Sequence, residues 1–303
     1  MSNELPDRLP RLWPRMPGRF LHCAILAGIL VAQGNAQNTT DTSRVRDWEV
    51  SLQIEISSLG LDFFQGDLAQ KVRYEPNNPP GFKLGLRYGG IGGSIGYSTG
   101  RMRDEFAVST QSRDLQFFWH RPRVGVDLYY QSYEGYFIEG DASRAPQLFP
   151  SLQMSTQTAN VYAKILGTAD LTALSAPSTF RQTAAWLVYA SAGASHRTVS
   201  STSDLDALIP SASIGALAAI PLGTFYVAPG LGIGIGYPFD LSEPPADMER
   251  ATKFNLRLMA GSVSSSGEWG LHAFQDSDLL DFASGTTFQF TSLRLRLFKS
   301  WKF

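Results

Sequence analysis

The chain has a single cysteine among 303 residues, charge on only 17% of them, and almost no net charge, with 26 basic against 27 acidic side chains. It also lacks any continuous run of about 18 apolar residues, which is close to the minimum for a membrane-spanning helix. The missing net charge gives no electrostatic support for binding nucleic acid. The missing apolar runs exclude a polytopic helical membrane protein. Glycine, at 28 residues, and aromatic side chains, at 12%, are plentiful.

The first 36 residues have the three parts of a secretory signal. Four arginines come first, an apolar run follows from Phe20 to about Ala32, and small residues lead up to Ala36. This order predicts export and cleavage after Ala36, leaving residues 37–303 as the mature outer-membrane domain. A membrane anchor is the alternative, but it would need about 20 apolar residues.

The one cysteine, Cys23, lies inside this signal and lacks the small preceding residues of a lipoprotein acylation site. The mature chain is therefore expected to contain no cysteine, which excludes disulfides and thiol catalysis. A start at Met16 instead of Met1 would leave the same apolar run in place.

The last residues of the chain alternate between apolar and polar side chains. Leu293, Leu295 and Leu297 are apolar, and Arg294 and Arg296 stand between them. A period of two places the two sets on opposite faces of one strand. In an exported protein this pattern predicts lipid on the apolar face and a polar lumen on the other. A strand that ends in aromatic residues, here Trp301 and Phe303, resembles the assembly signal of bacterial outer-membrane barrels.

The same alternation recurs along the chain and predicts an all-β, transmembrane, antiparallel up-and-down β-barrel of about twelve strands. Tight turns such as Gly89-Gly90 and Arg121-Pro122 alternate with long loops, as in outer-membrane barrels. Residues 167–182 are too long for a tight turn. They could hold part of an extra hairpin or of an overlong strand, so a total of 10–14 strands remains possible. A secreted β-sandwich is the alternative fold. The predicted strands are residues 48–57, 81–88, 91–98, 113–120, 123–132, 156–166, 183–195, 211–220, 224–236, 252–261, 268–275 and 286–300.

Three motifs carry a resemblance to a known family. They are Tyr74-Glu-Pro-Asn-Asn-Pro79 followed by Leu84-Gly-Leu-Arg-Tyr88 and Ile91-Gly-Gly-Ser-Ile-Gly-Tyr97, then Gly125-Val-Asp-Leu-Tyr-Tyr-Gln-Ser-Tyr-Glu-Gly135, and a weaker Leu208-Ile-Pro210, and they stand in this order. On these motifs the chain resembles an uncharacterised bacterial outer-membrane β-barrel family that is catalogued only as a domain of unknown function. The resemblance implies a barrel in the Gram-negative cell envelope and carries no activity, ligand or catalytic residue.

Strand parity places ten charged side chains on the lumen face. Because the first and last strands must pair to close a barrel, Glu49 and Glu55 should adjoin Arg294 and Arg296. Such a network either fills a narrow interior with ion pairs or, with six basic positions against four acidic ones, forms a selectivity ring for anionic solutes. The ten residues are Glu49, Glu55, Lys83, Arg87, Asp114, Asp127, Lys164, Arg257, Arg294 and Arg296.

Three histidines of the mature chain are the candidates for catalysis: His120, His196 and His272. A membrane-embedded hydrolase needs a serine beside one of them. Ser195 and His196 are adjacent on a strand and therefore point to opposite faces, so they cannot form such a pair. The spacing of His, Asp and Glu suggests no metal site, and we expect no cofactor.

These patterns predict a location and a shape more sharply than a role. We expect a monomer in the bacterial outer membrane, in contact with its lipids and with the barrel-assembly machinery through the C-terminal strand, and no nucleic acid. The expected role is non-enzymatic: a narrow or plugged pore for small polar solutes, or a structural surface barrel. A lipid hydrolase and a loop-based adhesion or receptor protein are the alternatives.

Overall fold

The computed structural model describes residues 48–65, 70–139, 145–175, 184–200, 205–242 and 247–303. The predicted signal peptide, with its cleavage site at Ala36, lies outside these residues. Within them, η1 (Leu171–Leu174) is a short 3-10 helix. None of the helices in this described part is long and apolar enough to cross a membrane.

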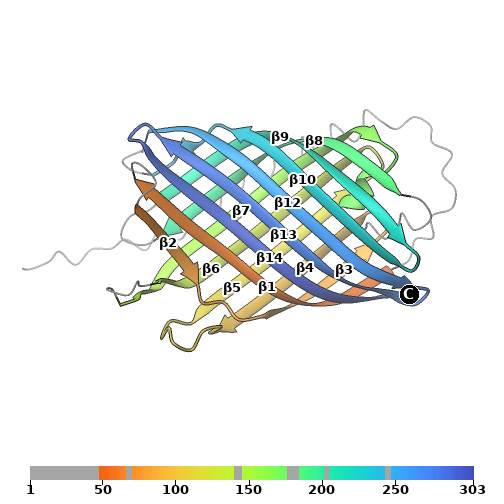
Figure 1. Ribbon diagram of the computed structural model, residues 1–303, viewed down its shortest axis with the longest axis horizontal. Helices are drawn as coiled ribbons and strands as arrows, with labels where there is room; N and C mark the ends of the chain where they lie inside the picture. Colours follow the sequence, from red (N-terminus) through yellow and green to blue (C-terminus); the bar gives the residue numbers. More distant parts are fainter. Residues whose placement is uncertain (1–47, 66–69, 140–144, 176–183, 201–204, 243–246) are drawn as a thin grey trace, which may run out of the picture. The chain divides into compact units, whose positions relative to one another are not determined.

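Twelve antiparallel strands of the described chain close into a barrel (Figure 1). Neighbours in the sequence are neighbours in the ring, and the ring closes where β1 (Trp48–Gln65) pairs with β14 (Thr286–Lys302). This arrangement confirms the predicted all-β up-and-down barrel and its twelve strands. The remaining ten are β3 (Gly81–Tyr88), β4 (Ile91–Gly100), β5 (Thr110–His120), β6 (Val124–Ile138), β7 (Gln147–Gly167), β8 (Ala185–Ser200), β9 (Leu205–Leu222), β10 (Phe225–Gly236), β12 (Met248–Ser264) and β13 (Gly267–Phe282).

Two further strands, which the sequence periodicity did not predict, lie off this ring. β2 (Gln70–Pro76) pairs with residues 61–65 of β1 and with residues 136–138 of β6. It therefore joins these two long strands beyond the ends of the shorter β3, β4 and β5. β11 (Phe239–Asp240) adds two residues to the edge of β9.

The two ends of the barrel differ in their connections. Tight turns at residues 89–90, 121–123, 223–224 and 265–266 lie at the end that also carries the C-terminus (Figure 1). We call this the short-turn end and the opposite one the long-loop end. At the short-turn end the backbone N–H of Phe303 donates to the carbonyl oxygen of Trp48 at 2.9 Å, so β1 and β14 stay joined up to the last residue.

The outward side chains over the middle of the barrel are apolar and exposed. Phe82 is 68% exposed, Leu84 55% and Ile95 63%, whereas the inward Lys83 is 2% exposed. Contiguous apolar surface of this extent does not occur on ordinary soluble monomers. It is the surface that a membrane barrel presents to lipid, with its polar side chains inside.

Most strands continue past their predicted ends at the long-loop side, and the alternation reverses there. β1 was expected to end at residue 57, but it runs to Gln65, with Leu59 and Leu61 now buried inside. The predicted loops 58–80, 133–155 and 196–210 are therefore largely strand. The reversal has a simple cause. Where the wall extends beyond the apolar belt, its outer face contacts water, so the apolar side chains are buried by pointing into the lumen.

These inward residues fill the lumen near the long-loop end with apolar side chains. Leu59, Tyr136, Met154, Ile209 and Leu280 come from β1, β6, β7, β9 and β13, and all are 0% exposed. The Tyr136 hydroxyl donates to the carbonyl oxygen of Leu59 at 3.0 Å, joining two strands that are not neighbours in the ring. We call this cluster the long-loop apolar layer.

Asn77, in the motif that follows Tyr74, is a buried connector rather than an exposed loop residue. Its Nδ2 donates to the carbonyl oxygens of Arg103, Phe106 and Val108 at 2.8, 3.3 and 3.0 Å. Its Oδ1 accepts the backbone N–H of Arg103 at 2.7 Å. One side chain thus bonds to backbone groups of four residues, 102, 103, 106 and 108, in the connection between β4 and β5.

Asn77→Asp should therefore loosen that connection with almost no change in side-chain size. A carboxylate cannot donate, so its oxygen would face the carbonyl oxygens that Nδ2 now serves, at a cost of about 3 kcal/mol. We expect the segment 101–109 to become sensitive to protease added to intact cells. Asp104→Asn, an exposed change in the same segment, is the control. Equal protease resistance of both variants would contradict this role for Asn77.

Candidate functional site

A polar cavity of about 240 Å³ lies inside the barrel, and we call it the polar chamber. Serine and threonine hydroxyls, glutamine and asparagine amides, aromatic rings and charged groups line it, and they come from all sides of the ring. The long-loop apolar layer lies at one end of the chamber. A second apolar cluster lies toward the short-turn end.

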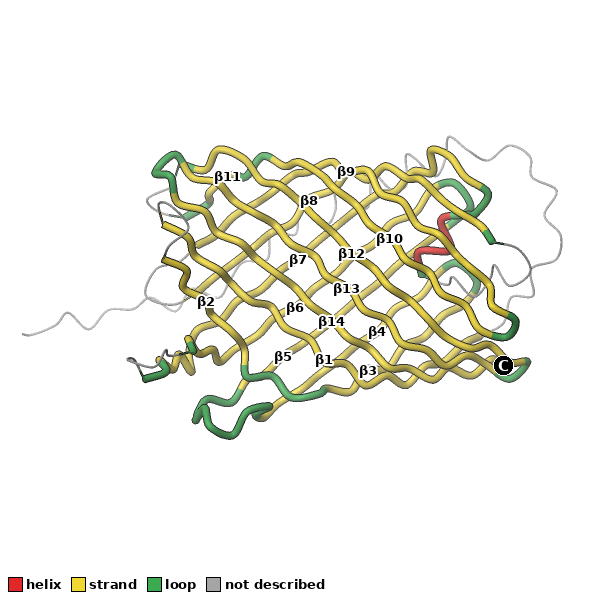
Figure 2. The backbone as a smooth tube through the Cα atoms, in the orientation of Figure 1, coloured by secondary structure: helices red, strands yellow, loops and turns green. Residues whose placement is uncertain are grey.

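Residues 168–175, the described part of the connection after β7, pack into the lumen at the short-turn end. Leu171, Ala173 and Leu174 of η1 are 0%, 0% and 4% exposed and belong to the same apolar cluster as the inward side chains of Tyr226 and Met259. Figure 2 draws η1 in red at the end of the barrel where the C-terminus lies. We call residues 168–175 the plug.

Two backbone hydrogen bonds hold the plug to the wall. Leu171 N–H donates to the carbonyl oxygen of Pro122 at 3.2 Å, and Ala169 N–H donates to that of Trp186 at 2.9 Å. The sequence left open an extra hairpin or an overlong seventh strand in residues 167–182, as alternatives to the twelve strands predicted. The described part of this stretch forms neither, because its apolar side chains turn into the lumen instead of continuing the sheet.

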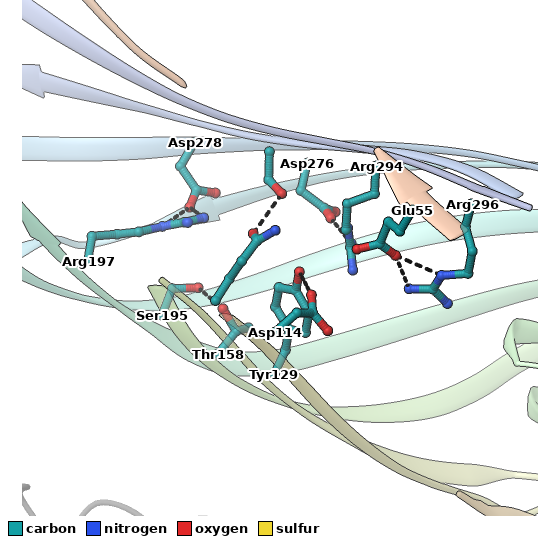
Figure 3. Close-up of polar contacts among 12 residues, drawn as sticks. Glu55, Asp114, Tyr129, Thr158, Ser195, Arg197, Asp276, Asp278, Arg294 and Arg296 are labelled. Atoms are coloured by element: carbon teal, nitrogen blue, oxygen red, sulfur yellow. Dashed lines mark hydrogen bonds and ion pairs between the residues drawn. The ribbon is translucent and has the colours of Figure 1, made fainter. Parts of the chain in front are cut away.

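Glu55 is the centre of a buried charge cluster on the wall beside the chamber (Figure 3). Its Oε2 lies 2.7 Å from Arg296 Nη2 and 3.7 Å from Lys83 Nζ. Lys83 also pairs with Asp114, whose second oxygen accepts the Tyr129 hydroxyl at 2.7 Å. Glu55 and Arg296 are direct register partners of β1 and β14, so closing the barrel is what brings them together.

A second set of ion pairs lies on the lumen side of the wall. Arg197 of β8 contacts Asp278 of β13 at 2.5 Å, and Lys253 Nζ lies 3.8 Å from the same carboxylate (Figure 3). Arg294 contacts Asp276 at 2.7 Å. Arg197 and Asp278 join strands that are not neighbours in the ring, whereas the contacts of Lys253 and Arg294 link the neighbouring strands β12, β13 and β14.

Nine of the ten charged residues assigned to the lumen by strand parity lie in the chamber wall or are buried beside it. Lys164 does not, because it stands at a β-bulge near the end of β7. Glu49 also differs from expectation. It pairs with Arg87 instead of adjoining Arg294 or Arg296, since the register sets it opposite Arg87 on β3 and Lys302 on β14.

Sequence reasoning missed five charged residues of the chamber. It ended two strands before Arg197, Asp276 and Asp278, and it left Lys253 and Glu268 unassigned although both lie inside predicted strands. Extending the predicted parity by a few residues would have found most of them. Counting them, the lumen wall carries seven basic and seven acidic side chains among the described residues, so the expected basic excess is absent. The five are Arg197, Lys253, Glu268, Asp276 and Asp278.

The three histidines have different surroundings. His196 faces away from the chamber, and its Nε2 lies 2.5 Å from Asp206 Oδ1. His272 lines the chamber, with Nε2 3.5 Å from the Tyr226 hydroxyl. His120 also lines it, with Ser175 of the plug within hydrogen-bond distance at 3.0 Å. The described residues contain no group of three or more His, Cys, Asp or Glu able to hold a metal ion.

The first part of the barrel, from β1 into β7, carries the first two motifs, whereas the third, Leu208-Ile-Pro210, lies on β9. Residues 48–166 match the model of the family described as Domain of unknown function (DUF4421). This match confirms the predicted resemblance to an uncharacterised family. No curated protein matches the chain.

Solved structures similar to the chain are outer-membrane proteins of different kinds. The outer membrane protease OmpT from Escherichia coli is 8% identical with a TM-score of 0.41, covering 88% of this chain and 100% of that one. The translocator domain of the autotransporter NalP from Neisseria meningitidis is 11% identical, TM-score 0.43, covering 94% and 98%. An outer membrane channel from Pseudomonas putida F1 is 13% identical, TM-score 0.39, covering 88% and 100%. At these scores the similarities support no inference about activity.

Proposed function

We propose that this protein is a plugged barrel of the bacterial outer membrane that admits small polar solutes to its polar chamber. The observation that carries the proposal is the 240 Å³ chamber, which lies inside an apolar-walled barrel with apolar packing toward both ends. A conducting porin keeps a continuous aqueous lumen. This barrel instead combines a polar interior with packed ends.

The orientation follows from the connections. Outer-membrane barrels place their short turns in the periplasm, so the short-turn end and the plug would face the periplasm. The exposed apolar belt would contact the lipids. Trp301 and Phe303, 40% and 78% exposed at the end of β14, remain available to the barrel-assembly machinery. The ring closes within one chain, which fits a monomer.

The chamber suits a small, hydroxyl- or amide-bearing solute rather than a highly charged one. Its volume lies just below the roughly 300–1,000 Å³ of drug-sized pockets, and its ionised groups are balanced. Within the described chain, Arg257 is the one lumen cation that has no carboxylate within 4.0 Å. Its guanidinium is therefore free to hold a negatively charged group of a solute.

Cysteine accessibility tests whether solutes enter. Ser213 lines the chamber, and Cys23, the only cysteine, lies in the predicted signal. In reconstituted protein, Ser213→Cys should react with a small methanethiosulfonate reagent and resist a bulky one. Ser266→Cys, at an exposed turn, should react with both. A chamber cysteine that reacts with neither reagent would mean a sealed structural barrel and would overturn the proposal.

Arg257→Gln should change which ions the chamber favours. Removing the unpaired cation turns the balanced wall net negative, which favours cations over anions in a confined, poorly screened space. We expect the Ser213→Cys thiol to react faster with a cationic methanethiosulfonate and more slowly with an anionic one. Arg250→Gln, a change of the same type on an exposed strand end, should leave that ratio unchanged. Equal ratios in both variants would assign Arg257 no part in selection.

A further inference from the structure

The turn between β5 and β6 brings a histidine and an aspartate together on the lumen face. His120 and Gly125 are register partners across this turn, and Asp127 follows two residues later on the same face. Gly125 provides room for the imidazole, because a Cβ there would lie 2.5 Å from His120 Cδ2. His120 Nε2 therefore reaches to 3.0 Å from Asp127 Oδ1.

The plug places a serine on the other ring nitrogen of this histidine. Ser175, directly after η1, has its Oγ 3.0 Å from His120 Nδ1, and the same hydroxyl is within reach of the Thr172 carbonyl oxygen at 3.3 Å. The plug is fixed to the same turn, since Leu171 N–H donates to the Pro122 carbonyl oxygen. Phe118 stacks on the imidazole at 5.5 Å and Tyr162 meets it edge-on at 6.1 Å, so the ring is held between two aromatic side chains.

A serine, a histidine and a carboxylate in this order make an activated nucleophile. The histidine accepts the serine proton, and the carboxylate orients the imidazole and stabilises its protonated form. All three groups line the polar chamber, while His120 is 2% exposed. We propose that Ser175, His120 and Asp127 form an acyl-transfer site that cleaves small carboxylic esters entering the chamber.

The reaction takes two balanced steps. Ser175 Oγ bonds to the ester carbonyl carbon and its proton passes to His120 Nδ1, then to the alcohol that leaves as the carbon–oxygen bond breaks. A water molecule then attacks the acyl-serine with His120 taking its proton. The new acid departs as Ser175 regains a proton from His120. The net reaction consumes one ester and one water and yields one acid and one alcohol.

The volume and the lining residues of the chamber limit the class of substrate. A volume of about 240 Å³ takes a short acyl chain and a small alcohol, and excludes an intact membrane lipid. Arg257 and Asn160 line the same chamber, and their side-chain N–H groups can donate to a polar substrate group. The substrate would therefore be a small water-soluble ester.

Labelling with a small alkyl fluorophosphonate tests the site in the folded, reconstituted protein. We expect one adduct on Ser175, absent from Ser175→Ala and reduced roughly 100-fold or more in rate in His120→Gln. Ser300→Ala is the matched control, because Ser300 is a buried serine at the same end whose hydroxyl bonds to the carbonyl oxygen of Glu268 rather than to a histidine. Hydrolysis of p-nitrophenyl acetate should likewise be unchanged in Ser300→Ala, slower in His120→Gln and lost in Ser175→Ala. Heat-modifiable gel mobility checks that each variant forms the barrel.

The acyl-transfer site can act only if solutes enter the chamber, which the proposed function also requires. A barrel that admits no solute and a chamber without the acyl-transfer site give different results in these experiments. If Ser213→Cys reacts with the small reagent but the unchanged protein takes no fluorophosphonate label, the acyl-transfer site is overturned and the solute chamber stands. Equal labelling of the unchanged protein and Ser175→Ala would overturn it as well.

Discussion

Leu171→Asp should open the short-turn end of the barrel to ions. Leu171 is 0% exposed at the centre of the plug, and a carboxylate there loses its water unless the plug moves out of the lumen. Burying an unpaired ionised group costs several kcal/mol, and about 3 kcal/mol shifts an equilibrium between two positions roughly 150-fold. In planar bilayers we expect the unchanged barrel to conduct rarely and the variant to show long open events.

Leu171→Met is the matched control, since a hydrophobic side chain of similar volume repacks at a cost below about 1.5 kcal/mol. It should conduct as rarely as the unchanged barrel. The plug is held mainly by apolar packing, with few hydrogen bonds to the wall, so its displacement should leave the twelve strands paired. If Leu171→Asp folds but stays closed, the long-loop apolar layer alone sets the conductance.

The fold was largely readable from the sequence because the membrane imposes one simple rule on its strands. Where lipid touches the wall, every second residue must be apolar, and β3, with Phe82, Leu84 and Leu86 outward, was predicted to its last residue. The rule fails beyond the apolar belt. Leu59 and Leu61 point inward there, so a search for outward apolar residues stopped before the strand did.

The candidate site was harder to predict because tertiary contacts assemble it. His120 and Asp127 were both recognised as lumen or rim residues, and the hairpin register makes them neighbours. Ser175 was not recognised, because the plug has no strand period and its packing depends on apolar partners far along the chain, such as Tyr226 and Met259. Polar residues on one wall can be found from parity, whereas a segment that folds into the lumen cannot.

Glu55→Gln should lower the stability of the barrel more than any other single charge removal described above. Glu55 is 5% exposed and neutralises both Arg296 and Lys83, on the two strands that flank β1. Removing one partner of a buried ion pair leaves an uncompensated charge and costs about 3–5 kcal/mol. We expect a clear shift of the midpoint of unfolding in urea, followed by the loss of heat-modifiable gel mobility.

A double variant separates the free-energy cost of an unpaired buried charge from the net contribution of the Glu55–Arg296 ion pair to stability. Glu55→Gln with Arg296→Gln removes both charges, so we expect it to be more stable than Glu55→Gln alone. Glu49→Gln is the control, since its partner Arg87 is 20% exposed and keeps access to water in the chamber, which limits the expected loss to about 1 kcal/mol. Equal losses for Glu49→Gln and Glu55→Gln would show that barrel closure at β1 and β14 depends on backbone pairing alone. An unequal loss, partly restored in the double variant, would show that charge burial at this seam helps to select the register in which the two ends of the sheet meet.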